Sequence, residues 1–435
     1  MNNRIIAIIA ALFFSNAMIA QETRTITLKE AIDFTLAYNK TLKTNKVKIE
    51  EASAAIKEAY EKKLPEASVS GSYLYLPVQP NINLKGGSDT GSGGGPNVNQ
   101  VIYGMASVSV PIYSGGRLKY GIESAKYLEQ AVKLDADNDR EQVILNTVNA
   151  CINLYKAHVA IGLVKENLEQ AQQRVKDFTS LEKNGVLARN DLMKAELQSS
   201  NVELALLDAQ TNYKLACVNM NLMMGLPEQT ELIPDRAGLA LPTSIKNFDD
   251  YEQDALKQRK DVTALSYREK AAETGIKSAK SAMYPSLALS AGYVAADIPG
   301  FLSVTNAINV GVGVKYDIAS LWKTKNKIQQ AKLKVQEVKI GEEALADNIK
   351  LEVNRAYQSY LLSQKKIEVY EKSVLQATEN YRITKNKYDN SLATTQELLD
   401  ADVALLQSKL SVTNAKADSF LAYNKLLQVT GSINN

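Results

Sequence analysis

The sequence has few of the side chains on which catalytic and metal sites depend. Its 435 residues include two cysteines, one histidine and one tryptophan. Metal sites and thiol or histidine chemistry need several such residues at short, defined spacing. His158 has no partner motif around it, so we predict a packed or solvated side chain there. The composition therefore indicates that the protein is not an enzyme and has no metal site or cofactor.

A surplus of charge of one sign is also missing. The 51 lysines and arginines are balanced by 48 acidic residues, which leaves a formal net charge of +3. Proteins that bind nucleic acid usually gather basic residues on one face. We therefore expect no nucleic-acid partner.

Long apolar runs are confined to the first twenty residues. A basic start at residues 2–4, an apolar core at 5–14 and small residues at 15–20 are typical of a secretory signal peptide. We predict cleavage after Ala20, with Ala17 as the alternative. A membrane anchor is the other interpretation, but the run is shorter than the ~20 residues of a spanning helix. No second run of spanning length follows, so any membrane insertion must use strands.

Proline is absent from residues 112–226 and 300–435, where glycine is also sparse. Since both residues disfavour helix interiors, these stretches can form very long helices. Residues 116–183 alone would give a helix of 68 residues, ~100 Å long. Apolar and small residues also recur at alternating spacings of three and four, which indicates a coiled-coil seam. The two seams contain Leu192, Ser199, Leu206, Tyr213 and Met220 with Ala195, Val202, Ala209, Ala216 and Met223, and then Leu398, Leu405, Val412, Ser419 and Leu426 with Ala401, Ser408, Ala415, Ala422 and Val429.

The sequence also repeats itself. The two seams are 206 residues apart, and the same offset relates Gly225 to Gly431. Upstream, the offset is 220, as between Pro65 and Pro285. The difference of fourteen residues is an insertion between Tyr73 and Val108, an interval that contains a flexible loop rich in glycine and serine at residues 82–96. We therefore predict a signal peptide at 1–20 and one mature protomer, 21–435, made of repeats 27–226 and 249–431. Each contains a helix ending at proline, two strands around a loop, and a long helical hairpin.

The four predicted strands lie near residues 66–76, 103–113, 286–295 and 307–317. Each alternates apolar residues with serine, glycine or other small and polar residues. In an exported chain this pattern fits a transmembrane barrel around water. A half-buried sheet on a helical core is the alternative, which we would prefer for a cytosolic chain. Because four strands cannot close a barrel, and open edges are not tolerated in lipid, we expect the protein to oligomerise.

Three local motifs extend this pattern to a known family. They are Tyr113-Ser-Gly-Gly-Arg117 at a strand-to-helix junction, and the segments 184–195 and 388–401 at the two hairpin turns. With them, the chain resembles the TolC family of bacterial outer-membrane efflux proteins over essentially its whole mature length. The resemblance implies a homotrimer whose twelve strands form one transmembrane β-barrel in outer-membrane lipid. It also implies that the mainly helical remainder continues as a long antiparallel coiled-coil α-barrel into the periplasm.

The resemblance further implies partners and a function. An inner-membrane pump and a periplasmic adaptor (a membrane fusion protein) would deliver the substrates that the channel exports. The alternatives are a periplasmic adaptor and a structural coiled-coil envelope protein. An adaptor has one hairpin and compact β-domains rather than two full repeats, and a structural protein has no need of serine-lined strands.

The same resemblance assigns roles to residues at the hairpin turns. Glu397 and Asp400 would line the pore constriction, although a solvated helix N-terminus is an alternative reading of these acids. Asp191 and Tyr388 would belong to the gate of the closed state. This gate is only partly transferable, because a basic residue and a glycine of the family pattern are replaced by Ala393 and Ser391. The turn residues that would meet the adaptor are Gly185, Val186, Leu187, Ser391, Leu392, Ala393 and Thr394.

The two cysteines fall at nearly the same level of the first hairpin, Cys151 before its turn and Cys217 after it. An oxidising periplasm permits a disulfide between them. Neither residue lies in the seam, however, and cysteine is a common small buried residue. We therefore predict two free, packed thiols.

Overall fold

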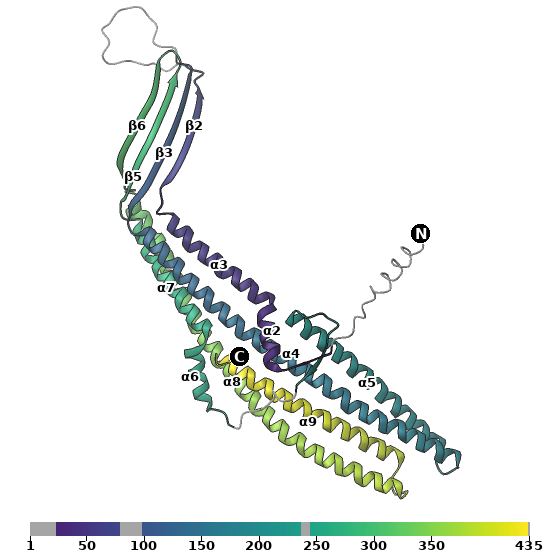
Figure 1. The fold of residues 1–435 in the computed structure, drawn as a ribbon. Helices are drawn as coiled ribbons and strands as arrows, with labels where there is room; N and C mark the ends of the chain where they lie inside the picture. Colours follow the sequence, from purple (N-terminus) through teal and green to yellow (C-terminus); the bar gives the residue numbers. More distant parts are fainter. Residues whose placement is uncertain (1–22, 79–97, 236–243, 434–435) are drawn as a thin grey trace, which may run out of the picture. The chain divides into compact units, whose positions relative to one another are not determined.

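The computed structural model describes residues 23–78, 98–235 and 244–433 (Figure 1). The predicted signal peptide at 1–20 and the loop at 82–96 lie outside the described residues. The chain forms two compact units, and each takes segments from both repeats. The first unit comprises Met1–Lys46, Asp135–Val262 and Ala344–Asn435, and the second comprises Val47–Leu134 and Thr263–Glu343.

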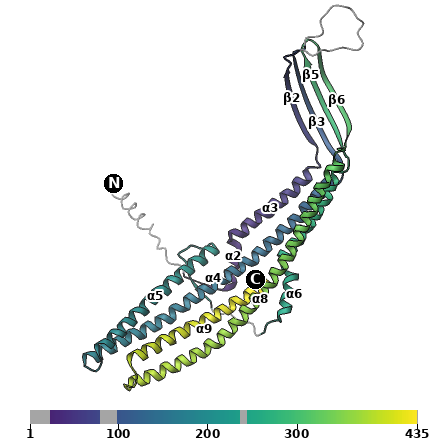
Figure 2. The ribbon, with the colours of Figure 1, turned by 180° about the vertical axis from the view of Figure 1, so that it is seen from behind.

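The long helices predicted from the lack of proline are present. The first hairpin consists of α4 (Arg117–Lys183), with 67 residues, and α5 (Arg189–Met224). The second consists of α8 (Ser320–Asp389), with 70 residues, and α9 (Thr395–Val429). Figures 1 and 2 show the two hairpins side by side, and α5 and α9 also contact each other directly.

The predicted seams lie on the buried faces of the returning helices. On α5 the buried seam residues are Ala195, Val202, Ala209, Tyr213 and Met220. On α9 they are Leu398, Ala401, Ala415, Ser419, Leu426 and Val429. Each returning helix therefore packs through the pattern of small and apolar residues that the sequence indicated.

Short elements complete the first unit. Strand β1 (Thr23–Ile26) pairs in parallel with β4 (Glu231–Pro234), and the helices α2 (Leu28–Tyr38) and α6 (Phe248–Gln258) pack on the two hairpins. The apolar core under β1 and α2 includes Ile26, Leu154, Met220 and Leu232, and the core under α6 includes Tyr251, Ile349, Val353 and Leu426. The β1–β4 pair was not predicted, because strands of four residues carry too little alternation to stand out.

The C-terminal glycines of the returning helices show the internal repeat at atomic level. Gly225 has a φ of 72°, and a Cβ there would approach the Tyr38 ring to 2.5 Å. Gly431 has a φ of 67°, and its Cβ would lie 3.1 Å from the backbone of Gln258 and of Arg259. Each glycine follows the end of a returning helix and lies against the junction between a short helix and a longer one. Gly225 lies at the junction of α2 with α3 (Lys40–Glu61), and Gly431 lies at the junction of α6 with α7 (Lys260–Ser281). The left-handed conformation and the close contact both favour glycine.

The prediction of free, packed cysteines is confirmed. Cys151 and Cys217 are free thiols buried in the core under β1. Burial raises the pKa of the Cys151 thiol to about 11. His158 is packed as well, with its ring centroid 5.5 Å from that of Tyr213.

The second unit contains an antiparallel sheet of four strands in the order β2-β3-β5-β6. They are β2 (Glu66–Tyr75), β3 (Gln100–Ser114), β5 (Ser286–Ile298) and β6 (Leu302–Lys315). The last two are longer than predicted at the end where they meet. A tight turn joins them there, because Gly300 adopts a positive φ of 76°.

The register of the sheet separates apolar from polar side chains, as the alternation predicted. One face carries Val69 and Tyr73 on β2, Ala106 and Val108 on β3, Leu289 and Tyr293 on β5, and Ile308, Val310, Val312 and Val314 on β6. The other carries Ser68, Ser107, Ser109, Ser290, Gly311 and Gly313, with the Ser68 and Ser107 hydroxyls 2.9 Å apart. The apolar face is uncovered, since Val69 is 87% exposed and Val310 is 73% exposed. In the part of the chain that the structure describes, no helix combines the length and the apolar character needed to cross a membrane.

Candidate functional site

The two hairpin turns have the same backbone structure. Gly185 has a φ of 73°, and its counterpart Ser391 has a φ of 59°. In each turn an amide bonds back across the end of the long helix, Val186 N to Leu181 O at 2.9 Å and Leu392 N to Lys387 O at 2.7 Å. Ser391 therefore holds the left-handed conformation that glycine holds in the first repeat.

Each turn also exposes one apolar side chain at the equivalent position. Val186 is 73% exposed, and Leu392 is 77% exposed. Burial of a leucine or valine side chain against a second protein is favourable, because it removes apolar surface from water. The turn residues named in the sequence analysis thus form a surface, here called the tip, with an apolar residue on each hairpin.

The two acids assigned to a constriction lie in the first turns of α9. Thr394 and Glu397 form a capping box, in which Thr394 N donates to Glu397 Oε2 at 2.6 Å and Glu397 N donates to Thr394 Oγ1 at 3.2 Å. These bonds, first the one from the Thr394 backbone, lower the pKa of the exposed Glu397 carboxyl. Asp400 accepts a bond of 2.8 Å from Gln396 Nε2. Glu397 therefore caps the N-terminus of α9, as the alternative interpretation of this acid expected. Because its pKa is lowered, its carboxylate stays ionised at a lower pH than that of an ordinary glutamate.

The two residues assigned to the gate are close to each other and have separate partners. The Tyr388 ring stacks on Phe178 of the first hairpin, with ring centroids 5.7 Å apart. Burial raises the pKa of the Tyr388 hydroxyl, the nearby Asp191 charge raises it further, and a bond with the Thr395 side chain opposes both. Asp191 is paired with Lys194 at 3.1 Å. Tyr388 therefore links the two hairpins through its ring.

A buried ion pair that the sequence analysis missed joins the hairpins farther along. Arg174 Nη1 of α4 lies 2.9 Å from Asp402 Oδ2 of α9, and both side chains are at most 10% exposed. Asn167 Nδ2 donates to the other carboxylate oxygen at 3.1 Å. Arg174 Nη2 also lies 3.4 Å from the Tyr381 hydroxyl of α8. The Asp402 carboxylate thus joins α9 to α4, and Arg174 extends the same cluster to α8.

This cluster had no signal in the sequence, because Arg174 and Asp402 are 228 residues apart. Asp402 directly follows the seam residue Ala401. At this position the coiled-coil pattern is compatible with an exposed acid and with a buried one. Only the packing of α4 against α9 decides between them.

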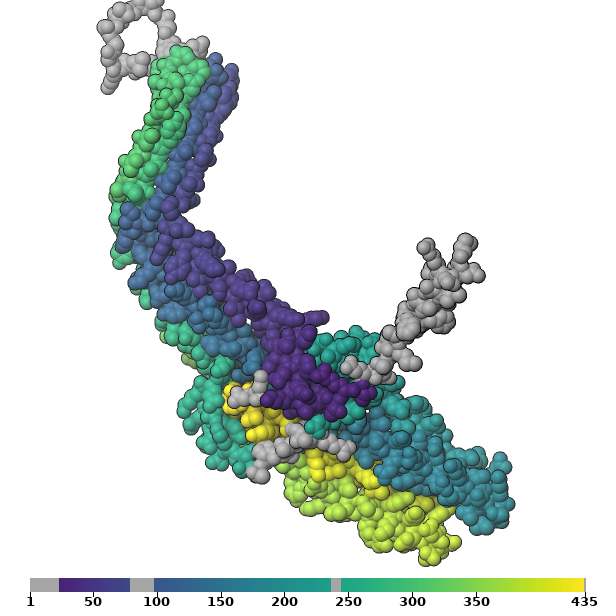
Figure 3. All heavy atoms as spheres, in the orientation of Figure 1, coloured from purple at the N-terminus to yellow at the C-terminus, as the bar shows by residue number. Residues whose placement is uncertain are grey.

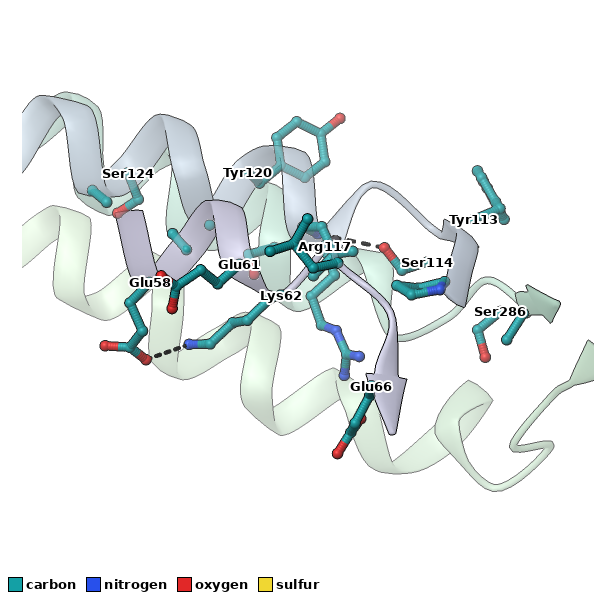
Figure 4. Close-up of a pocket in the computed structure, with 18 of the residues that line it drawn as sticks. Glu58, Glu61, Lys62, Glu66, Tyr113, Ser114, Arg117, Tyr120, Ser124 and Ser286 are labelled. Carbon is teal, nitrogen blue, oxygen red and sulfur yellow. Dashed lines mark hydrogen bonds and ion pairs between the residues drawn. The ribbon is translucent and has the colours of Figure 1, made fainter. Parts of the chain in front are cut away.

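The second unit has a hollow where the sheet meets the helices (Figure 4). Its volume is about 1140 Å³, and its lining includes the ends of α3 and β3 and the starts of α4 and β5. Ser109 and Ser286, both from the serine-bearing face of the sheet, line it together with Arg117 of the junction motif. Glu58 and Lys62 form an exposed pair of 3.0 Å at its edge. The serine-bearing face of the sheet therefore borders a hollow that polar and apolar side chains line together.

Comparison with known proteins identifies the family. The sequence matches the family described as outer membrane efflux protein over residues 31–226 and 252–432. It is 22% identical, over 323 residues, to the outer membrane efflux protein BepC of Brucella suis biovar 1 (strain 1330), a match that covers 74% of this chain and 70% of BepC.

Solved structures share the fold. The outer membrane protein VceC of Vibrio cholerae superimposes with a TM-score of 0.72 at 18% identity, covering 93% of this chain and 96% of VceC. The CmeC outer membrane channel of Campylobacter jejuni gives a TM-score of 0.74 at 19% identity, covering 93% of this chain and 85% of CmeC. The fold of long hairpins and a four-stranded sheet is therefore that of outer-membrane channels, as the resemblance implied.

The family match spans both repeats and most of the chain. In the described residues, no group of three or more histidine, cysteine, aspartate or glutamate side chains could hold a metal ion. The chain belongs to the outer membrane efflux protein family, and it is an efflux channel of the outer membrane that extends into the periplasm, not an enzyme.

Proposed function

We propose that three copies of the chain form one channel, which exports substrates delivered by an inner-membrane pump through a periplasmic adaptor. The observation that carries the proposal is the sheet of the second unit. It has one uncovered apolar face and one serine-lined face, and within the described part of the chain no strand pairs with the outer edge of β2 or of β6. An apolar outside and a polar inside are what a pore wall in lipid requires.

The unpaired edges support assembly from several copies. Alternating strand directions leave β2 and β6 antiparallel, so β6 of one copy can pair with β2 of the next in the same way as the strands within a copy. Unpaired backbone groups are costly in lipid, which favours a closed sheet. Two copies would give a barrel of eight strands, whose interior side chains would fill. Three copies would give a barrel of twelve strands, which is wide enough to hold water.

The tip supplies the closed end of the channel in this proposal. Glu397 and Asp400 of three copies form rings of negative charge that favour cations. Asp191 and Tyr388 hold the closed state, with the Tyr388–Phe178 contact joining the two hairpins. The adaptor contacts the tip residues, chiefly through the exposed Val186 and Leu392.

A variant that removes the charge of both acids tests the ring. Because Glu397 caps α9, we choose Glu397→Gln with Asp400→Asn, in which the glutamine can still take part in the capping box. Planar-bilayer recordings should show reduced cation selectivity and weaker block by multivalent cations. Glu342→Gln with Glu343→Gln, an acidic pair of α8 in the other unit, serves as the control and should leave both properties unchanged. Unaltered selectivity in the tip variant would refute the assignment of these two acids.

Extraction of outer membranes separates the proposed channel from the two alternative functions. The channel should be recovered there as a detergent-resistant trimer. A periplasmic adaptor or a structural coiled-coil envelope protein is not expected to form such a trimer, because neither needs to pair its strand edges within lipid.

A further inference from the structure

We propose that the start of α8 binds the headgroups of anionic phospholipids, in the leaflet of the outer membrane that faces the periplasm. Lys323, Lys325 and Lys327 hold the phosphate groups, and Trp322 lies beside them at the boundary between lipid and water. The inference rests on the proposed function, in which the sheet enters lipid, and it adds the kind of lipid that the protein selects.

The edge strand β6 leads from the uncovered apolar face of the sheet into an exposed apolar patch. Strands β5 and β6 are green in Figure 3, and Val314 near the end of β6 is exposed. Four residues between this point and the first turn of α8 are between 43% and 63% exposed, and they form the patch: Tyr316, Ile318, Leu321 and Trp322. The patch therefore prolongs the surface that faces lipid in the proposed channel.

The first repeat has two glycines at the corresponding place. With the offset of 206 residues, Leu321 and Trp322 correspond to Gly115 and Gly116. Gly115 is packed so closely that a Cβ there would lie 2.4 Å from the carbonyl oxygen of Ser281. At the second junction the chain instead exposes its single tryptophan. Neighbouring large apolar side chains that are exposed indicate a binding surface, and tryptophan and tyrosine prefer the boundary between lipid and water.

Three lysines follow the patch directly in the first turns of α8. Lys323, Lys325 and Lys327 are exposed, and within the described part of the chain none of them pairs with a carboxylate. The sequence has no acidic residue between Asp317 and Glu337. The three lysines therefore form a positive surface, here called the lysine cluster, that the neighbouring chain does not neutralise.

The lysine cluster does not stabilise the helix that carries it. Cations are unfavourable at the start of a helix, because the free amides there carry a partial positive charge. The helices α2, α5, α6, α7 and α9 have an acid in the first turn, whereas α8 has none. An anion outside the chain would compensate for this arrangement.

The adjacent end of α7 is basic as well. Lys277 and Lys280 lie in its last two turns and are exposed, and neither pairs with a carboxylate in the part of the chain that the structure describes. The strand that follows, β5, pairs with β6, and Ser286 at its start lies opposite Lys315. Positive charge therefore surrounds two neighbouring strand ends.

An anionic phospholipid satisfies both the patch and the lysine cluster. The span from Trp322 to Lys327 is about 8 Å along the helix, close to the depth of the headgroup region on one side of a bilayer, ~5–8 Å. The patch can thus lie at the edge of the acyl chains while the lysines reach the phosphates. A soluble anion or a nucleic acid would pair with the lysines and leave the patch in water.

Because Trp322 is the single tryptophan, its fluorescence tests the proposal in the unaltered protein. The oligomer extracted from outer membranes is placed in vesicles of phosphatidylcholine whose acyl chains carry bromine near the headgroup, and bromine quenches a tryptophan that it contacts. We expect strong quenching. Unbrominated phosphatidylglycerol, which is anionic, should relieve it better than unbrominated phosphatidylcholine, with a relative affinity of about 5-fold or more. High salt should reduce this preference.

Two variants with the same loss of charge locate the preference on the helix. In the first, the lysine cluster is neutralised by Lys323→Gln, Lys325→Gln and Lys327→Gln, and the relative affinity should fall to about 1 while quenching remains. The control neutralises three exposed lysines farther along α8, by Lys365→Gln, Lys366→Gln and Lys372→Gln. It should keep the preference of the unaltered protein.

Flotation of the vesicles with the bound protein shows insertion independently of Trp322. If the protein floats and bromine does not quench Trp322, the patch is covered by protein and the proposal is wrong. Equal affinity for the two lipids, or a preference that persists when the lysine cluster is neutralised, would also overturn it. Protein that does not float with the vesicles would contradict the insertion of the sheet, and with it the proposed function.

Discussion

Replacing Arg174 with alanine is expected to destabilise the packing between the two hairpins by about 3–5 kcal/mol. The reason is that the buried carboxyl group of Asp402, whose side chain is 4% exposed, would lose the cation that faces it, and Asn167 would remain as a hydrogen-bond partner. Removing one partner of a buried pair costs far more than the pair contributes, because the other charge is left without compensation. The amides of α4 and α9 near the cluster should therefore exchange their hydrogens faster by a factor of roughly 10² to 4 × 10³.

Two further variants distinguish this cause from a general effect of lost charge. Lys416→Ala removes a pair with Glu371 of 2.8 Å whose side chains are about half exposed, and it should change exchange little. Arg174→Leu combined with Asp402→Leu removes both buried charges and should recover much of the protection that Arg174→Ala loses. Equal exchange in Arg174→Ala and Lys416→Ala would show that the buried cluster does not hold the hairpins together.

Placing an arginine at Val310 is expected to prevent much of the protein from assembling in the outer membrane. Val310 lies near the middle of β6 on the uncovered apolar face. Arginine facing lipid near the middle of the bilayer costs about 2–4 kcal/mol, and the cost applies to every copy in the assembly. The yield of detergent-resistant oligomer from outer membranes should therefore fall sharply, with the rest of the chain left unassembled.

The next residue along β6 gives the control. Gly311 is on the serine-bearing face, and a Cβ added there meets no atom within 4 Å. Gly311→Arg should assemble almost normally, because its side chain projects toward water rather than lipid. If both variants assemble equally well, the apolar face of the sheet is not in contact with lipid.

Much of the fold could be predicted because its signals are local or periodic. The missing prolines marked the long helices, and the 206-residue repeat implied two equal hairpins, which Gly185 and Ser391 now match in backbone conformation. The strand faces followed from alternation alone. The short β1–β4 pair could not be predicted, because its four-residue strands are brought together from positions more than 200 residues apart.

The site was less accessible from the sequence. The family pattern led to Glu397, whereas the local pattern Thr394-x-x-Glu397 is itself a capping-box signature, and the structure contains that box. The Arg174–Asp402 pair was missed because burial of a charge depends on which helices pack together, a property that no local window records. Sequence reasoning thus located the tip but not the contacts that hold its two hairpins.

Single-channel recording of the purified, unaltered protein in planar bilayers tests the central claim most directly. We expect discrete conductance steps of uniform size, carried preferentially by cations. Protein that is recovered from the outer membrane as an intact oligomer, and inserts into the bilayer without producing such steps, would contradict the claim that the chain forms a channel.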